Sequence, residues 1–155
     1  MKIFLDFDDL LFDTNAFFVS LQYIFEEFGI SKEISLKSYQ EIKAEFPRGG
    51  WCYSFGRHIE KLKQYVAFDE EDLRKRLMMF ITDTERFLFS DVENFLSSLK
   101  KNGHTLCILS FGDRQFQLAK IAGAGISHFI ERNIITDKDK AVALQGEIND
   151  NEEGI

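Results

Sequence analysis

This chain of 155 residues is poor in cysteine, proline and positive charge, and these shortages argue against some kinds of site and partner. Its two cysteines, Cys52 and Cys107, lack metal-ligand spacing, so we expect reduced thiols in or near the core. The formal net charge of −7 argues against nucleic acid as the main partner, because a phosphate backbone needs a basic surface. A small phosphorylated substrate stays compatible with this charge, since a bound cation can reverse the local field.

Long hydrophobic runs are also missing. No apolar stretch is long enough to cross a membrane, and the one that begins at residue 3 is too short for a signal peptide. We therefore expect a cytoplasmic protein without a membrane partner. The length corresponds to about one domain with a hydrophobic core, and we expect most of the seventeen phenylalanines to pack there.

The N-terminal segment Ile3–Phe12 carries the strongest signal. Its apolar start predicts a short buried strand, which ends in three carboxylates within four positions. Because strand side chains alternate between faces, Asp6 and Asp8 are expected to point the same way. Like charges held that close resist ionisation unless a cation lies between them, and Mg²⁺ often binds one or two carboxylates together with phosphate oxygens. The alternative is a solvated loop that follows a strand.

The rest of the chain divides into two parts with different patterns. From residue 14 to about 85, apolar residues recur at helical spacing, and Ser35 is a candidate cap of the second helix. From residue 90 onward, helices alternate with predicted strands at Thr105–Leu109 and Asn133–Thr136, which implies parallel strands with right-handed crossovers. The predicted fold is α/β: a Rossmann-like parallel sheet with an all-helical cap after the first strand. We expect a core of residues 1–13 and 86–155 and a cap of residues 14–85.

Polar groups are expected beyond the carboxyl ends of all three strands, where open parallel sheets hold their sites. Together they could move a phosphoryl group: one carboxylate attacks phosphorus, a second handles the leaving-group proton, and the donors hold the phosphoryl oxygens. In chain order they are Asp6 and Asp8, then Ser110 with the amides of Phe111 and Gly112 at a helix start, then Lys138 and Lys140.

These motifs resemble those of the haloacid dehalogenase (HAD) superfamily, and in particular its phosphatases with a helical cap. Asp6-Phe7-Asp8-Asp9-Leu10 is similar to the family's first motif, Asp-x-Asp-x-Thr/Val. The apolar strand that ends in Ser110 is similar to the second motif, and Lys138 or Lys140 would be the lysine of the third. Lys140 is favoured because it lies nearer the start of the last helix.

The resemblance implies roles for these residues. Asp6 would be the nucleophile that becomes an aspartyl phosphate, and Asp8 would be the general acid and base, with both residues at a Mg²⁺ ion. Ser110, Phe111 and the lysine would bind the phosphoryl group. The implied activity is a Mg²⁺-dependent phosphatase that hydrolyses a small phosphorylated metabolite. Dehalogenase chemistry suits Asp8 less well, and a receiver-type signalling domain would need its acceptor aspartate after a later strand.

The sequence also departs from the family pattern. Asp9 and Leu10 replace the usual glycine and the usual threonine or valine. No apolar strand precedes the acidic residues near the end, Asp150, Glu152 and Glu153, so a fourth motif with further metal ligands is missing. The first strand would then be a sheet edge with unpaired backbone groups. We expect either a fragment of a longer protein or a second chain, such as a homo-oligomer partner, that covers this edge.

Three further predictions concern the function as a whole, the insert and Lys120. The alternative to an enzyme is a catalytically impaired HAD-like domain that acts as a binding or oligomerisation module. Arg48 and Arg57 in the insert are candidate contacts to the substrate's leaving group, with ordinary surface positions as the alternative. Lys120 is expected at the surface of its helix.

Overall fold

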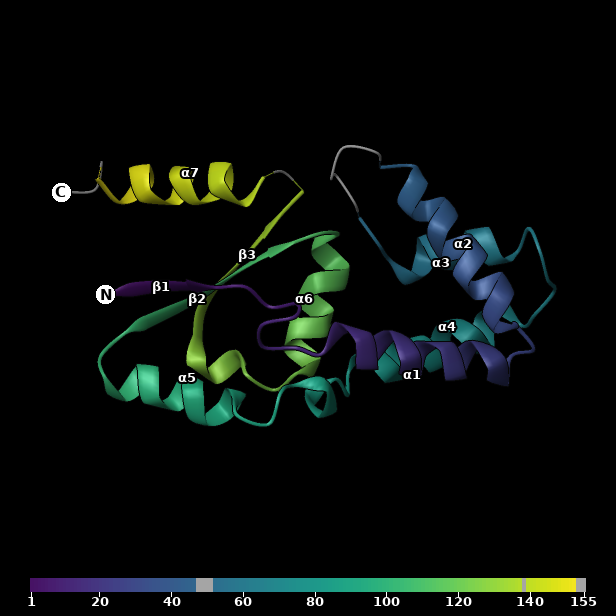
Figure 1. Cartoon of the computed structure of the whole chain (residues 1–155), viewed down its shortest axis with the longest axis horizontal. Helices are drawn as coiled ribbons and strands as arrows, with labels where there is room; N and C mark the ends of the chain where they lie inside the picture. Colours follow the sequence, from purple (N-terminus) through teal and green to yellow (C-terminus); the bar gives the residue numbers. More distant parts are fainter. Residues whose placement is uncertain (47–51, 138, 153–155) are drawn as a thin grey trace.

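The computed structural model describes residues 1–46, 52–137 and 139–152, with side chains through residue 146. Within these residues a parallel β-sheet carries helices on both sides, and four α-helices are inserted after the first strand (Figure 1). The predicted fold class is therefore confirmed. We call α1 to α4 and their connections the cap; the predicted domain limits at residues 13 and 86 stay a prediction. None of the described helices has the length and apolarity that crossing a bilayer requires.

The sheet has the order β1-β2-β3, with β1 at Lys2–Leu5, β2 at Thr105–Phe111 and β3 at Ile130–Thr136. Both pairings are parallel, and the register sets Lys2 opposite Thr105 and Phe111 opposite Thr136. β2 continues two residues past its predicted end because Ser110 and Phe111 still pair with β3. Within the described residues, β1 forms one edge of the sheet.

The cap consists of α1 (Thr14–Glu27), α2 (Lys32–Ala44), α3 (Phe55–Leu62) and α4 (Glu70–Ile81). Asp13 caps α1, and its Oδ1 accepts from the backbone N–H of Ala16 at 2.8 Å. The prediction that Ser35 caps α2 is wrong. Ser31 does so one turn earlier, and Ser35 is buried inside the helix.

Three helices cover the sheet: α5 (Val92–Lys101), α6 (Arg114–Gly123) and α7 (Lys140–Glu152). In Figure 1, α5 and α7 lie on opposite sides of the sheet, and α6 lies between the sheet and the cap. α7 is longer than the sequence predicts. It contains Asp150 and Glu152, whereas Glu153 lies outside the described residues.

Buried aromatic rings join the cap to the core. Phe17 of α1 packs against Phe80 of α4 with ring centroids 4.9 Å apart, and against Phe12 and Phe87 at 5.6 Å. Each fully buried ring contributes about 2 kcal/mol through apolar surface removed from water. Phe89 and Phe95 are exposed, so the expected packing holds for many of the phenylalanines rather than for all.

A close backbone contact fixes α6 against the end of the cap. A Cβ atom on Gly123 would lie 2.1 Å from the carbonyl oxygen of Ile81, so only glycine permits this approach. Thr84 donates from its N–H to the carbonyl of Gly123 at 3.1 Å and from Oγ1 to the carbonyl of Lys120 at 2.8 Å. This contact sets the position of α6, which carries two residues of the site described next.

Candidate active site

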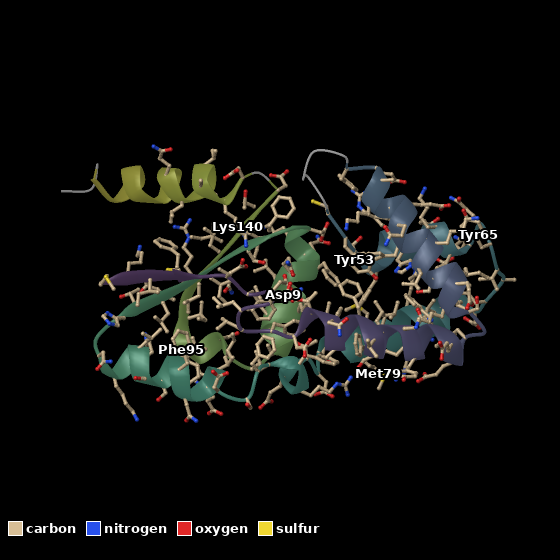
Figure 2. The ribbon with its side chains drawn as sticks, viewed as in Figure 1. Asp9, Tyr53, Tyr65, Met79, Phe95 and Lys140 are labelled. Atoms are coloured by element: carbon tan, nitrogen blue, oxygen red, sulfur yellow. The ribbon has the colours of Figure 1, made fainter. Side chains whose placement is uncertain are left out.

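Asp6 follows β1 directly and meets the first residue of α7. Its Oδ2 lies 2.5 Å from Nζ of Lys140, and its Oδ1 accepts from the backbone N–H of Phe7 at 2.8 Å. The structure therefore brings together Asp6 and Lys140, 134 residues apart in the chain, as the strand-end argument predicts. Lys138, the other candidate for this position, lies outside the described residues. Figure 2 shows Lys140 near the beginning of α7, toward the end of the sheet that is nearer the cap.

Asp8 lies in the short loop between β1 and α1 and accepts three hydrogen bonds. Its Oδ1 accepts from Oγ1 of Thr14 at 2.9 Å and from Nζ of Lys120 at 2.5 Å. Its Oδ2 accepts from Nε2 of Gln117 at 2.8 Å. The next residue, Asp9, has φ of 60°, a left-handed conformation that aspartate tolerates better than most residues and that turns the chain toward α1.

The prediction of a surface position for Lys120 is wrong. Its side chain is buried, with the residue 3% exposed, and its ammonium pairs with Asp8. The cation lies 5.1 to 5.8 Å from the centroids of four phenylalanine rings, an arrangement that favours a charge over aromatic faces. The sequence predicts a surface position because the other residues of this helix look structural. Lysine is rarely buried without a partner, and the partner here comes from a distant segment.

Asp8 is held as a carboxylate. Burial alone would raise the pKa of this carboxyl, but the Lys120 ammonium and the hydrogen bonds from Lys120, Gln117 and Thr14 lower it below the usual value. The same ammonium is close enough to Asp6 and Asp9 to interact with their charges. The loop after β1 thus concentrates negative charge that two lysines neutralise.

Gln117 is the residue that the sequence reasoning missed. Besides Asp8, its Nε2 contacts Oγ of Ser110 at 3.1 Å and the carbonyl oxygen of Phe111 at 2.8 Å. It therefore joins the loop after β1 to the end of β2. Its Oε1 is buried and has no hydrogen-bond partner among the described residues. The available signal was its position on α6, three residues before Lys120.

The second strand supplies Ser110 as predicted, but the backbone amide of Gly112 is already used in another hydrogen bond. Ser110 is 1% exposed and lies inside β2 rather than at its end. The amide of Gly112, expected to face an anion, donates to the carbonyl of Thr136 at 3.0 Å. Asp113 caps α6 by accepting from the N–H of Phe116 at 2.9 Å.

Of the two arginines proposed from the cap, the described one, Arg57, is not among these groups. Arg57 stacks over the ring of Phe46 at 5.2 Å and lines a separate cavity with Glu45, Glu60 and Lys61. Arg48 lies outside the described residues, so its predicted contact with substrate stays a prediction.

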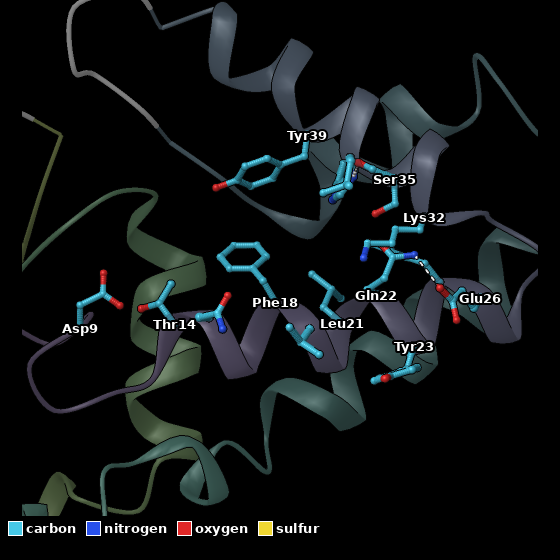
Figure 3. A pocket seen from close by; sticks show the side chains of 15 residues that line it. Asp9, Thr14, Phe18, Leu21, Gln22, Tyr23, Glu26, Lys32, Ser35 and Tyr39 are labelled. Atoms are coloured by element: carbon cyan, nitrogen blue, oxygen red, sulfur yellow. Dashed lines mark hydrogen bonds between the residues drawn. The ribbon is translucent and has the colours of Figure 1, made fainter.

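Two neighbouring cavities adjoin the site. The first, of about 220 Å³, lies between the cap and the core beside Asp8, Gln117 and Lys120. The second, of about 490 Å³, lies between α1 and α2 (Figure 3). They share Thr14, Phe18 and Tyr39, so the space beside Asp8 is bounded on its cap side by residues of α1 and α2.

The oxygen atoms at the end of β1 could supply some, but not all, of the ligands of a hard divalent cation. Asp6 and Asp8 offer carboxylate oxygens, and Mg²⁺ commonly uses one or two carboxylates and completes its shell with water and substrate oxygens. The described residues contain no group of three or more histidine, cysteine, aspartate or glutamate side chains arranged to hold a metal. The two carboxylates therefore fit an open site that other oxygens would complete.

A model of the haloacid dehalogenase-like hydrolases matches residues 3–148, which include all of the groups above. The chain belongs to this hydrolase family. Glyceraldehyde 3-phosphate phosphatase of Methanothermobacter thermautotrophicus is 27% identical over 146 residues, covering 88% of this chain and 62% of that protein. The chain thus spans under two thirds of the length of this curated relative.

Solved structures share the fold. A haloacid dehalogenase-like hydrolase from Burkholderia xenovorans superposes with a TM-score of 0.71 at 22% identity, covering 96% of this chain and 66% of that one. A HAD-hydrolase from Bacillus subtilis, bound to magnesium, gives 0.60 at 16% identity, with 88% and 65% covered. A HAD phosphatase from Thermococcus onnurineus gives 0.56 at 19% identity, with 88% and 63% covered.

Proposed function

We propose that this chain carries the catalytic groups of a Mg²⁺-dependent phosphatase that hydrolyses a small phosphorylated metabolite through an aspartyl phosphate on Asp6. The observation that carries the proposal is the pair of carboxylates after β1, each matched to a lysine, with Ser110 joined to Asp8 through Gln117. The phosphatase name of the curated relative supports phosphate esters as the substrate class.

In the first half of the reaction, a carboxylate oxygen of Asp6 attacks phosphorus and the bond to the leaving oxygen breaks. Lys140 holds Asp6 in place and neutralises charge on the phosphoryl oxygens, and the hydroxyl of Ser110 donates to one of them. Asp8 gives a proton to the leaving oxygen. The negative charge of the substrate would raise the pKa of Asp8 from its lowered value and so favour the protonated form needed here.

In the second half, water attacks phosphorus and releases Asp6. Asp8, now a carboxylate held by Thr14, Gln117 and Lys120, accepts the proton of that water. The carboxylate of Asp6 and the backbone carbonyl of Asp8 would hold Mg²⁺, which when bound supplies a Lewis acid that screens the repulsion between Asp6 and an anionic ester.

Matched amide substitutions test these roles. Asp6→Asn and Asp8→Asn should each lower the turnover of a phosphate ester by roughly 10³-fold or more, because one removes the nucleophile and the other the proton donor. Asp9→Asn is the control, since it makes the same chemical change one residue away in a backbone conformation that asparagine tolerates. Circular dichroism would verify folding, and full activity of both variants would refute the roles.

A second candidate function is a binding or oligomerisation module, favoured by the position of β1 at a sheet edge within the described residues. An edge strand offers unpaired backbone groups to another chain. This candidate predicts no phosphatase turnover and a defined oligomer. Sedimentation that shows a monomer at all accessible concentrations would contradict it.

A further inference from the structure

The described cap residues that line the cavity beside Asp8 are uncharged. The cap residues that line it are Thr14, Phe18, Tyr39 and Tyr53, and Phe116 of α6 completes an aromatic wall. The charged lining residues all belong to the core. Among the described cap residues, 14–46 and 52–85, none that lines this cavity is ionic.

The rings of this wall support one another. Phe18 contacts both Tyr39 and Tyr53 with ring centroids 5.3 Å apart, and Tyr53 contacts Phe116 at 5.1 Å. All three contacts have interplanar angles of 67° to 76°, the edge-to-face geometry that aromatic pairs favour. The wall is therefore built before any ligand arrives, and on the cap side a ligand would meet mainly ring surface, beside the hydroxyls of Thr14 and Tyr39.

A buried histidine holds the hydroxyl of Tyr53 inside the cap. Tyr53 Oη lies 2.8 Å from Nδ1 of His58, and Nε2 of His58 lies 2.8 Å from Oγ of Ser38 and 3.2 Å from the carbonyl of Ser35. The Ser38 hydroxyl already donates to that same carbonyl at 2.9 Å, so its hydrogen is used. Nε2 of His58 therefore carries the proton, and Nδ1 accepts from Tyr53.

We propose that the substrate's leaving group is uncharged and apolar, with an aromatic group preferred, and that it packs on this wall. The inference rests on the proposed phosphatase function, which places the phosphoryl group at Asp6, Ser110 and Lys140. A charged leaving group would lose its hydration against the rings without meeting an opposite charge on the described cap residues, and a polyhydroxylated one would meet only the hydroxyls of Thr14 and Tyr39 there. Tyr39 and Phe18 are then specificity-determining residues, and His58 is a positioning residue that acts through Tyr53.

Two esters with leaving alcohols of similar basicity test the inference on the unaltered chain: benzyl phosphate and glycerol 3-phosphate. We expect kcat/KM to favour benzyl phosphate by about tenfold or more, the size of effect that ring packing and apolar burial produce. Equal efficiency, or a preference for glycerol 3-phosphate, would overturn the inference while leaving the phosphatase function intact.

A matched pair of variants locates the preference. Tyr39→Ser should bring the ratio of the two kcat/KM values close to one, because it removes a ring of the wall. Tyr65→Ser makes the same change at the far end of the cap and should preserve the ratio (Figure 2). A ratio that survives in Tyr39→Ser, with the fold verified by circular dichroism, would contradict the assignment.

Binding separates this inference from catalysis. Calorimetry on Asp6→Asn with each ester should show tighter binding of benzyl phosphate, again by about tenfold. If neither ester is hydrolysed by the parent chain but this preference is found, the phosphatase function fails and the apolar site stands. If Asp6→Asn binds glycerol 3-phosphate as tightly as benzyl phosphate, the apolar site is refuted whatever the turnover.

Discussion

Two polar clusters reach the cavity beside Asp8, one through Asp8 and Lys120 and the other through Tyr53, and they are built in opposite ways. In the core, the carboxylate of Asp8 pairs with the ammonium of Lys120. In the cap, His58, Tyr53 and Ser38 form a hydrogen-bonded chain without an ion pair. Burial raises the pKa of Tyr53 well above its usual value and lowers that of His58 to about 4, so both are neutral at pH 7. Charged side chains thus lie on the core side, where the proposed phosphoryl group would react. The described cap residues on the other side, where the leaving group of the substrate would lie, are neutral.

The largest expected effect on stability comes from breaking the charged cluster. Lys120→Met leaves the partly buried carboxylate of Asp8 without its cation, which should lower the free energy of unfolding by about 2 kcal/mol. Urea denaturation measures this change. Lys75→Met, which breaks an exposed ion pair with Glu71, is the control and should cost much less. Similar losses in both variants would mean that the buried pair is not special.

A second variant sharpens this test. Adding Asp8→Asn to Lys120→Met removes the unpaired charge and should recover part of the lost stability. No recovery would indicate that the packing of the lysine stem among the phenylalanine rings, rather than its charge, dominates.

The uncharged cluster of His58, Tyr53 and Ser38 should affect how the stability of the protein depends on pH. The pKa of His58 falls from 6.5 to about 4 on folding, so the unfolded chain binds the extra proton between these values. The contribution of His58 is complete above about pH 6.5 and is lost as the pH falls through this window, amounting to about 2 kcal/mol by pH 5. The carboxyl of Asp8 affects stability at lower pH than His58 does. Its pKa is lowered on folding, so its contribution is lost only as the pH falls below the usual pKa of a carboxyl group.

Denaturation at pH 8 and pH 5 measures the histidine effect. In His58→Gln the loss between these two pH values should shrink. If the parent and His58→Gln lose stability equally over this range, His58 is not the buried neutral group inferred from its contacts.

The smallest effect tests a single hydroxyl of the neutral cluster. Tyr53→Phe keeps the ring of the wall but leaves Nδ1 of His58 without its donor, which should lower the free energy of unfolding by about 1–2 kcal/mol. Tyr65→Phe removes an exposed hydroxyl that donates to Glu41, where water can replace it. Equal unfolding midpoints for the parent and Tyr53→Phe would show that the His58 chain does not hold the tyrosine.

The sequence predicts the positions of only those site residues that lie next to the end of a strand or the start of a helix. Asp6, Asp8 and Ser110 lie at or near strand ends and Lys140 at a helix start, and parallel strands bring these places to one edge of the sheet. Their roles in a reaction stay predictions, although their positions match what the strand-end argument expects.

Lys120 and Gln117 could not be predicted this way. Lysine and glutamine normally lie at the surface, and only the orientation of α6, fixed in part by the close contact at Gly123, turns these two toward Asp8. The His58 cluster was hidden for a related reason, because its members come from α2, from α3 and from the segment before α3. Such side-chain pairings depend on packing between helices that periodicity alone does not reveal.

One measurement tests the central claim most directly: hydrolysis of a generic aryl phosphate by the 155-residue chain, with Mg²⁺ and with a chelator. We predict turnover that depends on the metal and disappears in Asp6→Asn. Turnover that is the same with the chelator, or that persists in Asp6→Asn, would contradict an aspartyl-phosphate phosphatase. No turnover by the folded chain would contradict the claim that these residues suffice for catalysis.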